Sequence, residues 1–176
     1  MSKKVIKLKL SDRDIDDAVK QLANYKKWLK DCTEKFLEEL GNEGVEIATA
    51  KFKSAEYDGT NDVSVTMQKR SDTQVAVVAV GTSVLFIEFG TGINNPNLHP
   101  EAEQNGFIHG QYGYGLGRLS KGWRYEGEPG THGQVITSGK NKGMVQTKGN
   151  IANMSMYQTV RELQQRFEEI ARRCYV

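Results

Sequence analysis

Three histidines, His99, His109 and His132, are the side chains in this sequence best suited to hold a metal ion or to move a proton near neutral pH. A zinc site brings three or four ligands together at compact spacings. Here the separations are 10 and 23 residues, and no cysteine lies nearby. We therefore predict that these histidines are solvated or stacked loop residues. A metal-dependent hydrolase is the weakest functional alternative.

Other motifs that carry chemistry lack their required spacing. Residues 113–117 are glycine-rich without the G-x-G-x-x-G pattern, and residues 133–140 are one residue too long for a P-loop, with Asn141 at the Ser/Thr position. The sequence has no G-x-S-x-G, and neither cysteine has a nearby histidine. We predict that the chain is not an enzyme and has no catalytic residue, cofactor or metal.

One carboxylate stands inside an apolar run. Glu88 is the single charged residue of segment 84–89, which fits either a third strand or a short helical turn. A carboxylate is costly to bury unless it is hydrogen-bonded or paired. Glu88 is therefore either a buried structural acceptor or a side chain aimed at a partner. We favour a structural acceptor, bonded to the backbone of the turn that follows it or to a basic partner.

That turn is the predicted corner at which a packed body ends and an insert begins. Glycine adopts positive φ without steric cost, so two glycines let the chain change direction there. The predicted corner consists of Glu88, Phe89, Gly90, Thr91 and Gly92.

Length and composition indicate one domain. The chain has 176 residues, enough to bury a core, although its apolar share of 38% is below the usual 45–50% or so. A net charge of +2 is too balanced for nucleic acid or an acidic membrane as the main partner. No apolar run nears 18 residues and no signal-peptide pattern occurs, so we expect a soluble protein made in the cytoplasm. Cys32 and Cys174 could meet, but a reduced, partly buried pair is the simpler expectation.

The domain has three predicted parts: 11–92 with a helix and strands, 93–150 as a Gly-rich insert or arm, and 151–176 as a closing helix. Apolar steps of three and four predict a helix from 11 to about 40, a stop or kink at 41–44 and a further helical piece to about 53. Alternation predicts a strand over 63–67, a run of Val and Ala predicts a more buried strand over 74–81, and the two together predict a hairpin. Apolar residues also alternate with lysines over residues 4–10, which predicts either a strand on a sheet edge or a frayed terminus. The fold class is α+β: a long N-terminal helix and a C-terminal helix packed on a small, mainly antiparallel sheet.

The insert is unusually rich in glycine. Residues 90–149 contain 14 of the 18 glycines and all three prolines. Segments 123–126 and 143–147 are predicted short strands of a β-arm that could not order itself alone. It would gain order against a partner or a neighbouring subunit, through an insert interface of Tyr112, Tyr114, Trp123 and Tyr125. The alternative is a nucleic-acid-binding module, because basic and aromatic residues interleave over 112–125, although Glu126 and Glu128 follow.

The closing helix begins at a predicted capping box, the S-x-x-Q pattern of Ser155 and Gln158. An apolar stripe after it predicts a core-facing helix that packs on the sheet. The residues that lead into this helix are Asn153, Met154, Met156 and Tyr157.

Three segments together resemble a known family. Residues 87–92 (Ile-Glu-Phe-Gly-Thr-Gly) resemble an E-[FY]-G-T-G signature, and residues 57–61 (Tyr-Asp-Gly-Thr-Asn) resemble a D-T-G-x-L turn with its order changed. Residues 147–157 resemble a segment in which Pro-Ala-x-Pro-[FM] precedes the last helix, with Ile151 and Met154 where prolines are common. In this order, over residues 11–174, the chain resembles the gene-product-ten-like tail-component family of long-tailed phages and prophages, also described as tail-completion or neck proteins.

The resemblance implies a virion structural protein that acts in tail assembly at or near the head–tail junction. Such subunits form rings that join the connector to the tail tube, and a heterologous interface with rotational closure makes a ring. The implied partners are further copies of the chain and other neck and tail proteins. The resemblance implies no membrane and no small-molecule substrate, and nucleic acid only as DNA passing through the channel. The protein would be made in the host cytoplasm and located in the virion.

Overall fold

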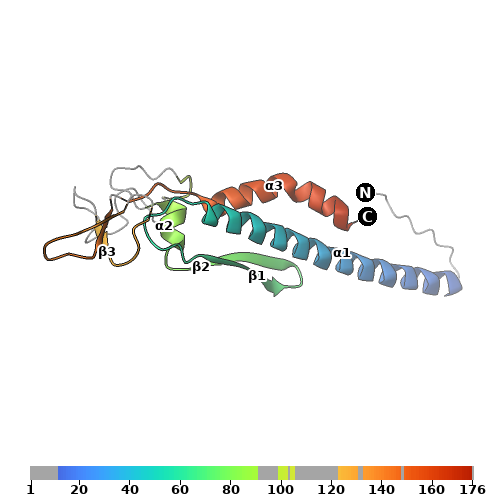
Figure 1. The fold of residues 1–176 in the computed structure, drawn as a ribbon. Helices are drawn as coiled ribbons and strands as arrows, with labels where there is room; N and C mark the ends of the chain where they lie inside the picture. The colour runs from blue at the N-terminus through green and yellow to red at the C-terminus, as the bar shows by residue number, and fades with distance from the viewer. Residues whose placement is uncertain are drawn as a thin grey trace.

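The computed structural model describes residues 12–90, 99–102, 104–105, 123–130, 133–147 and 149–175. They form an α+β fold with a long N-terminal helix, a C-terminal helix and small antiparallel sheets, as predicted (Figure 1). The predicted strand at residues 4–10 lies outside the described residues. The elements in chain order are α1 (Asp12–Lys53), β1 (Ser64–Ser71), β2 (Gln74–Val80), α2 (Val84–Phe89), β3 (Trp123–Tyr125), β4 (Gln134–Val135), β5 (Val145–Thr147) and α3 (Ser155–Cys174).

Helix α1 is continuous for 42 residues, so the predicted stop or kink at 41–44 is wrong. Gly41 and Gly44 lie inside the helix and are buried. A Cβ atom on Gly41 would lie 2.2 Å from the Met67 sulfur, and one on Gly44 would lie 2.8 Å from Val77 Cγ2. The two glycines therefore let the hairpin approach the helix backbone closely. In this place glycine serves packing between elements rather than chain termination.

Strands β1 and β2 form the predicted hairpin, an antiparallel pair that joins Ser64 to Val80 and Met67 to Val77. Met67 of β1 and Val75 and Val77 of β2 face α1, where they lie beside Gly41 and Gly44. Segment 84–89, which fitted a strand or a helical turn, is the short helix α2.

Helix α3 packs along α1 rather than on the sheet, so the predicted packing partner of this helix is wrong. Phe36, Ile170 and Cys174 form the buried core between them, surrounded by partly buried Leu37, Leu40, Ala171 and Tyr175. In Figure 1, α1 lies between α3 and the hairpin, and the three elements meet at Gly44, whose Cβ would also lie 3.1 Å from Leu163 Cδ1. Cys32 and Cys174 are both buried and free, in agreement with the expected reduced pair.

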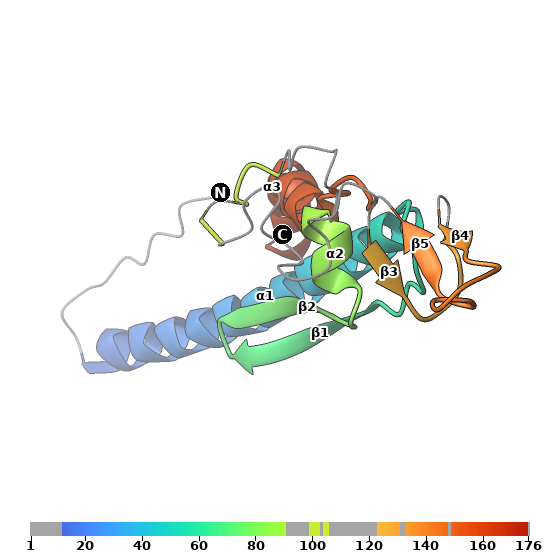
Figure 2. The same cartoon turned by 90° about the vertical axis from the view of Figure 1, so that its left-hand side faces the viewer.

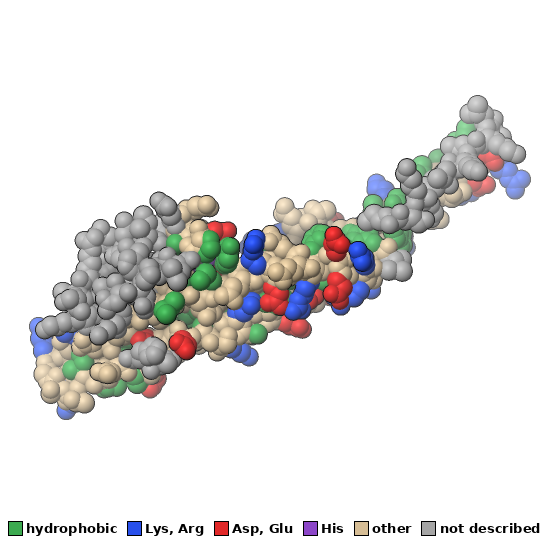
Figure 3. All heavy atoms as spheres, turned by 90° about the horizontal axis from the view of Figure 1, so that it is seen from above, with side chains coloured by type: hydrophobic (Ala, Val, Ile, Leu, Met, Phe, Trp, Pro, Cys, Tyr) green, Lys and Arg blue, Asp and Glu red, His purple; other side chains and the backbone are tan. Residues whose placement is uncertain are grey.

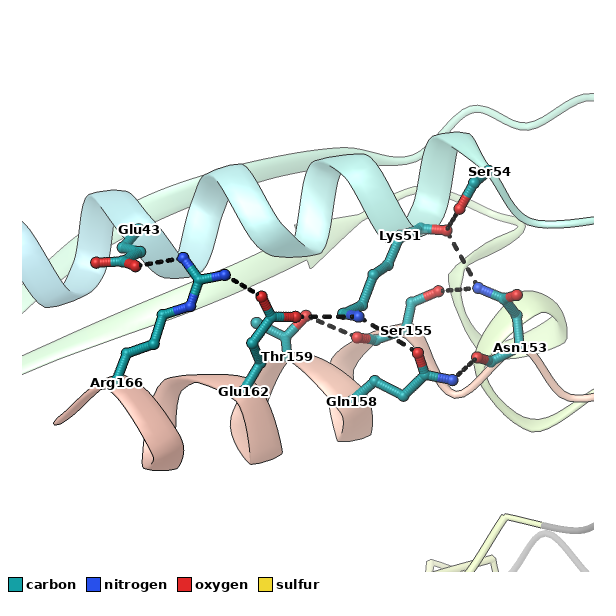
Figure 4. A network of polar contacts seen from close by, with 9 residues as sticks. All are labelled: Glu43, Lys51, Ser54, Asn153, Ser155, Gln158, Thr159, Glu162 and Arg166. Atoms are coloured by element: carbon teal, nitrogen blue, oxygen red, sulfur yellow. Dashed lines mark hydrogen bonds and ion pairs between the residues drawn. The ribbon is translucent and has the colours of Figure 1, made fainter.

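A polar network fixes the first half of α3 on the last turns of α1 (Figure 4). Lys51 Nζ lies 3.3 Å from Glu162 Oε2, and Arg166 bridges Glu43, at 2.7 Å, and Glu162. The hydrogen bond that the Arg166 guanidinium donates to Glu43 raises the pKa of Arg166. Exposed pairs of this kind add little stability each, but they fix the register between the two helices.

The second sheet has the strand order β3–β5–β4, all antiparallel. Its strands β3 and β5 confirm the two segments predicted in the insert. Figure 2 shows this sheet at one end of the molecule, beyond the hairpin. Val145 and Thr147 in β5 are buried, so the described part of the insert packs on the body of its own chain. Neither helix of 18 or more residues in the described segments is apolar enough to span a bilayer.

Candidate functional site

Buried polar side chains gather at the end of the molecule where α2, β5 and the start of α3 meet. A buried polar group destabilises the fold unless it is hydrogen-bonded, so such a concentration marks a specifically built site. We call this set the buried polar cluster. In the described segments it consists of Asp58, Ser83, Glu88, His99, Thr147, Asn150, Ser155 and Thr159.

Glu88 is the centre of the cluster, and its carboxylate caps helix α3. Oε2 accepts a hydrogen bond from the Met156 N–H at 2.7 Å, and Oε1 accepts one from the Tyr157 N–H at 2.9 Å. The first N–H groups of a helix have no partner within it, and the helix dipole favours negative charge there. A carboxylate 68 residues earlier in the chain therefore supplies the cap for α3.

The local capping box predicted for α3 does not form. Met154 occupies the N-cap position in the left-handed conformation (φ 54°, ψ 39°) without a side-chain cap. Ser155 is the first helical residue and accepts a hydrogen bond from Asn153 Nδ2 at 2.7 Å, while Gln158 Nε2 donates to the Asn153 carbonyl at 3.0 Å. The capping prediction is wrong because Ser155 lies one position too far into the helix to cap it.

Glu88 is the buried structural acceptor that the sequence predicted, and three of its donors lie in the described residues. The donors are two amides of α3 and the ring of His99, whose Nε2 lies 3.0 Å from Glu88 Oε1. The expected donors in the following turn include Thr91 and Gly92, which lie outside the described residues.

His99 is a neutral imidazole in this arrangement. Its Nδ1 accepts a hydrogen bond from the Glu101 N–H at 3.0 Å, so the ring proton resides on Nε2 and is donated to Glu88. The ring lies 4.5 Å from the ring of Phe89 and 5.3 Å from that of Tyr157. It is thus a buried histidine that meets Phe89 at a tilt and Tyr157 edge-on, not the solvated or stacked loop residue that was expected. His109 and His132 lie outside the described residues.

The backbone of α2 also pairs with the segment that leads into α3. The Asn153 N–H donates to the Ile87 carbonyl at 2.8 Å, and the Met154 N–H donates to the Glu88 carbonyl at 3.2 Å. Gly90 ends α2 at φ 72° and ψ 170°, where a Cβ would lie 2.6 Å from the Ala152 nitrogen. The positive φ expected at this corner is therefore confirmed for Gly90, and close backbone approach is a second reason for glycine there.

The turn after α1 holds the base of the insert. The Thr147 hydroxyl of β5 donates to the Asp58 carboxylate, and the Gly149 N–H donates to the Thr147 hydroxyl at 3.0 Å. Gly130 lies so close to the same turn that a Cβ would lie 2.0 Å from the Tyr57 carbonyl oxygen. These contacts join the segment 57–61 to the segment 147–157.

A cleft of about 330 Å³ lies between this turn and β3, lined by Tyr57, Asp58, Arg124, Tyr125, Thr147 and Asn150 among others. Burial raises the pKa of the Tyr57 phenol, with further contributions from Tyr125 and nearby carboxylates. Burial also raises the pKa of Tyr125, whose hydroxyl donates to the Glu128 carbonyl at 3.0 Å. Both phenols therefore stay protonated at neutral pH, and the Asp58 carboxylate beside them accepts a hydrogen bond from Thr147.

Asp62 positions the start of α2. Its carboxylate accepts hydrogen bonds from the Ser83 hydroxyl at 2.5 Å, from the Thr82 and Ser83 amides at 2.7 and 2.9 Å, and from the Thr82 hydroxyl at 2.8 Å. These bonds, the Ser83 hydroxyl first, hold the pKa of Asp62 well below its ordinary value. Asp62 therefore favours the folded state whenever it is ionised.

This gives a pH-dependent prediction. A carboxyl whose pKa is lowered by folding contributes its stability above about pH 4 and loses it as the pH falls from there toward the lowered value. We expect Asp62→Asn to reduce the free energy of unfolding by about 1 kcal/mol at pH 7, because Asp62 is exposed and solvent screens its bonds. The difference from the wild type should shrink as urea unfolding is repeated at falling pH. Asp31→Asn, at another exposed acid, is the control. Equal pH slopes for both variants would contradict this role for Asp62.

The structure brings together two of the three predicted groups of site residues. Glu88 and Gly90 of the corner contact the segment that leads into α3 with Asn153, Met154, Met156 and Tyr157, and Phe89 lies against His99. In the insert group, the Trp123 backbone pairs with Thr147 and Tyr125 lines the cleft. Tyr112 and Tyr114 lie outside the described residues. His99 was not predicted in the site, because nothing in the sequence around it indicates a contact with Glu88.

The described residues offer no metal site, and the chain has no match among known proteins. The described residues contain no group of three or more His, Cys, Asp or Glu side chains placed to hold a metal ion. No model of a known protein family, no curated protein and no solved structure matches the chain.

Proposed function

We propose that this chain is a structural subunit of a phage tail that assembles as a ring at or near the head–tail junction. The observation that carries the proposal is the meeting of three segments, 57–61, 87–92 and 147–157, in the buried polar cluster. Asp58 bonds to Thr147, and Glu88 bonds to the amides of α3. These are the segments whose sequences resemble the tail-component family. Their convergence supports treating the resemblance as one structural motif rather than three chance matches.

The geometry also supports an assembly role for the insert. Its described strands are fixed to the body through Thr147, Gly130 and Asn150, whose Nδ2 donates to the Phe86 carbonyl at 3.2 Å. A rigid base fixes where the rest of the insert leaves the body. An arm with a fixed origin suits repeated, identical contacts between neighbouring subunits, which is what a closed ring requires.

The surface of the two long helices is mixed in charge and does not form a basic face (Figure 3). Figure 3 shows Lys and Arg side chains interspersed with Asp and Glu on the face over α1 and α3. Several of these charges are paired, as Lys51 is with Glu162 and Arg173 is with Glu39. Nucleic-acid-binding surfaces concentrate basic residues on one face.

The proposal is tested by replacing residues 106–122 with a Gly-Ser linker of equal length. We expect the wild-type chain to form closed rings, visible by negative-stain electron microscopy and by light scattering, and the replaced chain to fold but not to form rings. A double variant, Glu168→Ser with Arg172→Ser, changes exposed residues of α3 and should keep the rings.

Two results would contradict the proposal. One is a wild-type chain that stays monomeric at high concentration with its insert protected from proteolysis, which would mean that the insert folds back on its own body. The other is binding of labelled single-stranded DNA, measured by fluorescence polarisation, that weakens steeply with salt. That result would favour the nucleic-acid-binding module.

A further inference from the structure

The N-terminal part of α1 projects beyond the rest of the body. The last contacts of α3 with α1 are made by Tyr175, whose hydroxyl lies 2.9 Å from Thr33 Oγ1 and whose ring lies 6.5 Å from that of Trp28. The hairpin ends at the same level, where Lys30 lies 3.8 Å from Asp72. Residues 13–27, which we call the α1 extension, run on for about 22 Å (Figure 1).

The α1 extension carries large apolar side chains that reach solvent. Ile15, Val19 and Leu22 are 47%, 59% and 55% exposed, and Leu29, next to the extension, is 41% exposed. They recur at helical spacing, so they share one side of the helix. A continuous apolar stripe on a soluble protein usually marks an interaction surface.

This stripe continues the seam that α3 fills further along the same helix. Apolar residues alternate in steps of three and four, the a and d positions of a coiled coil, at Ile15, Ala18, Leu22, Tyr25, Leu29, Cys32 and Phe36. At the C-terminal end of this repeat, Cys32 and Phe36 are buried, Phe36 in the core that it shares with Ile170 and Cys174 of α3. At the N-terminal end, Ile15 and Leu22 remain exposed, whereas the small side chain of Ala18 between them is buried. The heptad pattern is therefore longer than the helix that packs on it.

We propose that the α1 extension of a second copy of the chain packs antiparallel on this stripe and forms a two-fold dimer. The direction follows from the charge polarity of the extension. Its first turns hold Asp16 and Asp17, whereas its later turns hold Lys26 and Lys27, with Lys30 just beyond. Antiparallel packing places the acidic end of each copy beside the basic end of the other, and parallel packing would place like charges together.

The same direction agrees with the packing already present. Helix α3 runs antiparallel to α1, since its first turns lie by Lys51 and its last residue lies by Thr33. A second α1 in antiparallel orientation therefore runs in the direction of α3 and occupies the part of the seam beyond Tyr175. A two-fold axis uses the same patch on both copies, which this self-complementary stripe satisfies.

This proposal does not depend on a role in a phage tail. The α1 extension and the sheet β3–β5–β4 of the insert lie at opposite ends of the described structure (Figures 1 and 2). A dimer through α1 and a ring through the insert therefore use separate surfaces. Loss of either contact by mutation leaves the other in place, and the two proposals fail independently.

Sedimentation of the full-length chain across a concentration series tests the dimer. We expect the wild type to dimerise through α1. If the insert also joins subunits, this contact should pair the resulting assemblies and double their mass. Leu22→Glu should raise the dimer dissociation constant by about 100-fold or more, because the two-fold axis places the changed residue in the interface twice. Asn24→Glu adds the same charge at an exposed position away from the stripe and should leave the dimer intact. Circular dichroism checks that both variants keep their helix content.

Three results would overturn the proposal. The first is a dimer that Leu22→Glu does not weaken. The second is a dimer that tightens as ionic strength rises from about 0.05 to 0.5 M, since screening weakens the attraction between opposite charges and relieves repulsion between like ones. The third is a wild type that does not self-associate through α1 until residues 2–10 are deleted. That result would show that the chain's own N-terminal segment occupies the stripe.

Discussion

Glu88→Ala should lower the free energy of unfolding by about 3–4 kcal/mol, one of the two largest effects of a single substitution that we expect in this chain. The change removes the cap of α3 and leaves the amides of Met156 and Tyr157 without their acceptor. It also leaves the Nε2–H of His99 buried without its partner. A buried donor without an acceptor costs more than the lost hydrogen bond itself. Urea unfolding followed by circular dichroism measures the loss.

Glu88→Gln separates the charge from the shape of this side chain. The glutamine oxygen can accept the hydrogen bonds from Tyr157 and His99, but its amide group would then face the Met156 N–H, and two donors cannot bond. We expect an intermediate loss of about 1–2 kcal/mol. Glu126→Ala, which removes an exposed acid, is the control and should change stability by less than about 0.5 kcal/mol. If Glu88→Ala unfolds at the same urea concentration as Glu126→Ala, the capping role is wrong.

Gly90→Ala should destabilise the protein by about 4 kcal/mol, for two reasons that add. The backbone at φ 72° and ψ 170° lies in a region that is almost confined to glycine. The new methyl group would also lie 2.6 Å from the Ala152 nitrogen and 2.9 Å from the Asn150 carbonyl oxygen, both of which are backbone atoms held in the paired segment. Neither atom can move without breaking the contacts between α2 and the start of α3. Thermal unfolding measures the effect.

Gly139→Ala is a matched control for this experiment. Gly139 also has a positive φ, 84°, but a Cβ there would meet nothing within 4 Å. We expect Gly139→Ala to lower the free energy of unfolding by about 1 kcal/mol, the cost of placing a side chain at positive φ. The difference between the two variants isolates the close approach at Gly90. Equal losses of stability would mean that the segment 150–152 does not pack against Gly90 as described.

The elements of this fold could be predicted from the sequence where their cause is local. The alternation in β1, the Val and Ala run of β2 and the apolar spacing of α3 lie within each element, and the two strands and the helix are confirmed where they were predicted. The continuity of α1 could not be predicted in this way. Gly41 and Gly44 normally indicate the end of a helix, and only contacts with Met67 and Val77 of a distant hairpin explain why they lie inside one.

The site shows the same division between local and distant causes. A carboxylate in an apolar run predicts that Glu88 is a buried acceptor, and the structure confirms it. Its donors depend on how α3 approaches α2, which no local pattern contains. Ser155 and Gln158 had the composition of a capping box, yet a residue from another segment caps the helix. His99 gave no signal at all, because its role exists only once Glu88 and Tyr157 lie beside it.

The most direct test of this account is amide hydrogen exchange at Met156 and Tyr157, compared between the wild type and Glu88→Ala. These are the two amides that the Glu88 carboxylate caps. We predict slow exchange at both in the wild type, and a selective loss of protection in Glu88→Ala that is larger than the loss at Ile170, in the core near the other end of α3. Fast exchange of both amides in the wild type, or an equal loss of protection at Ile170, would contradict the claim that Glu88 caps α3 and joins α2 to the start of that helix.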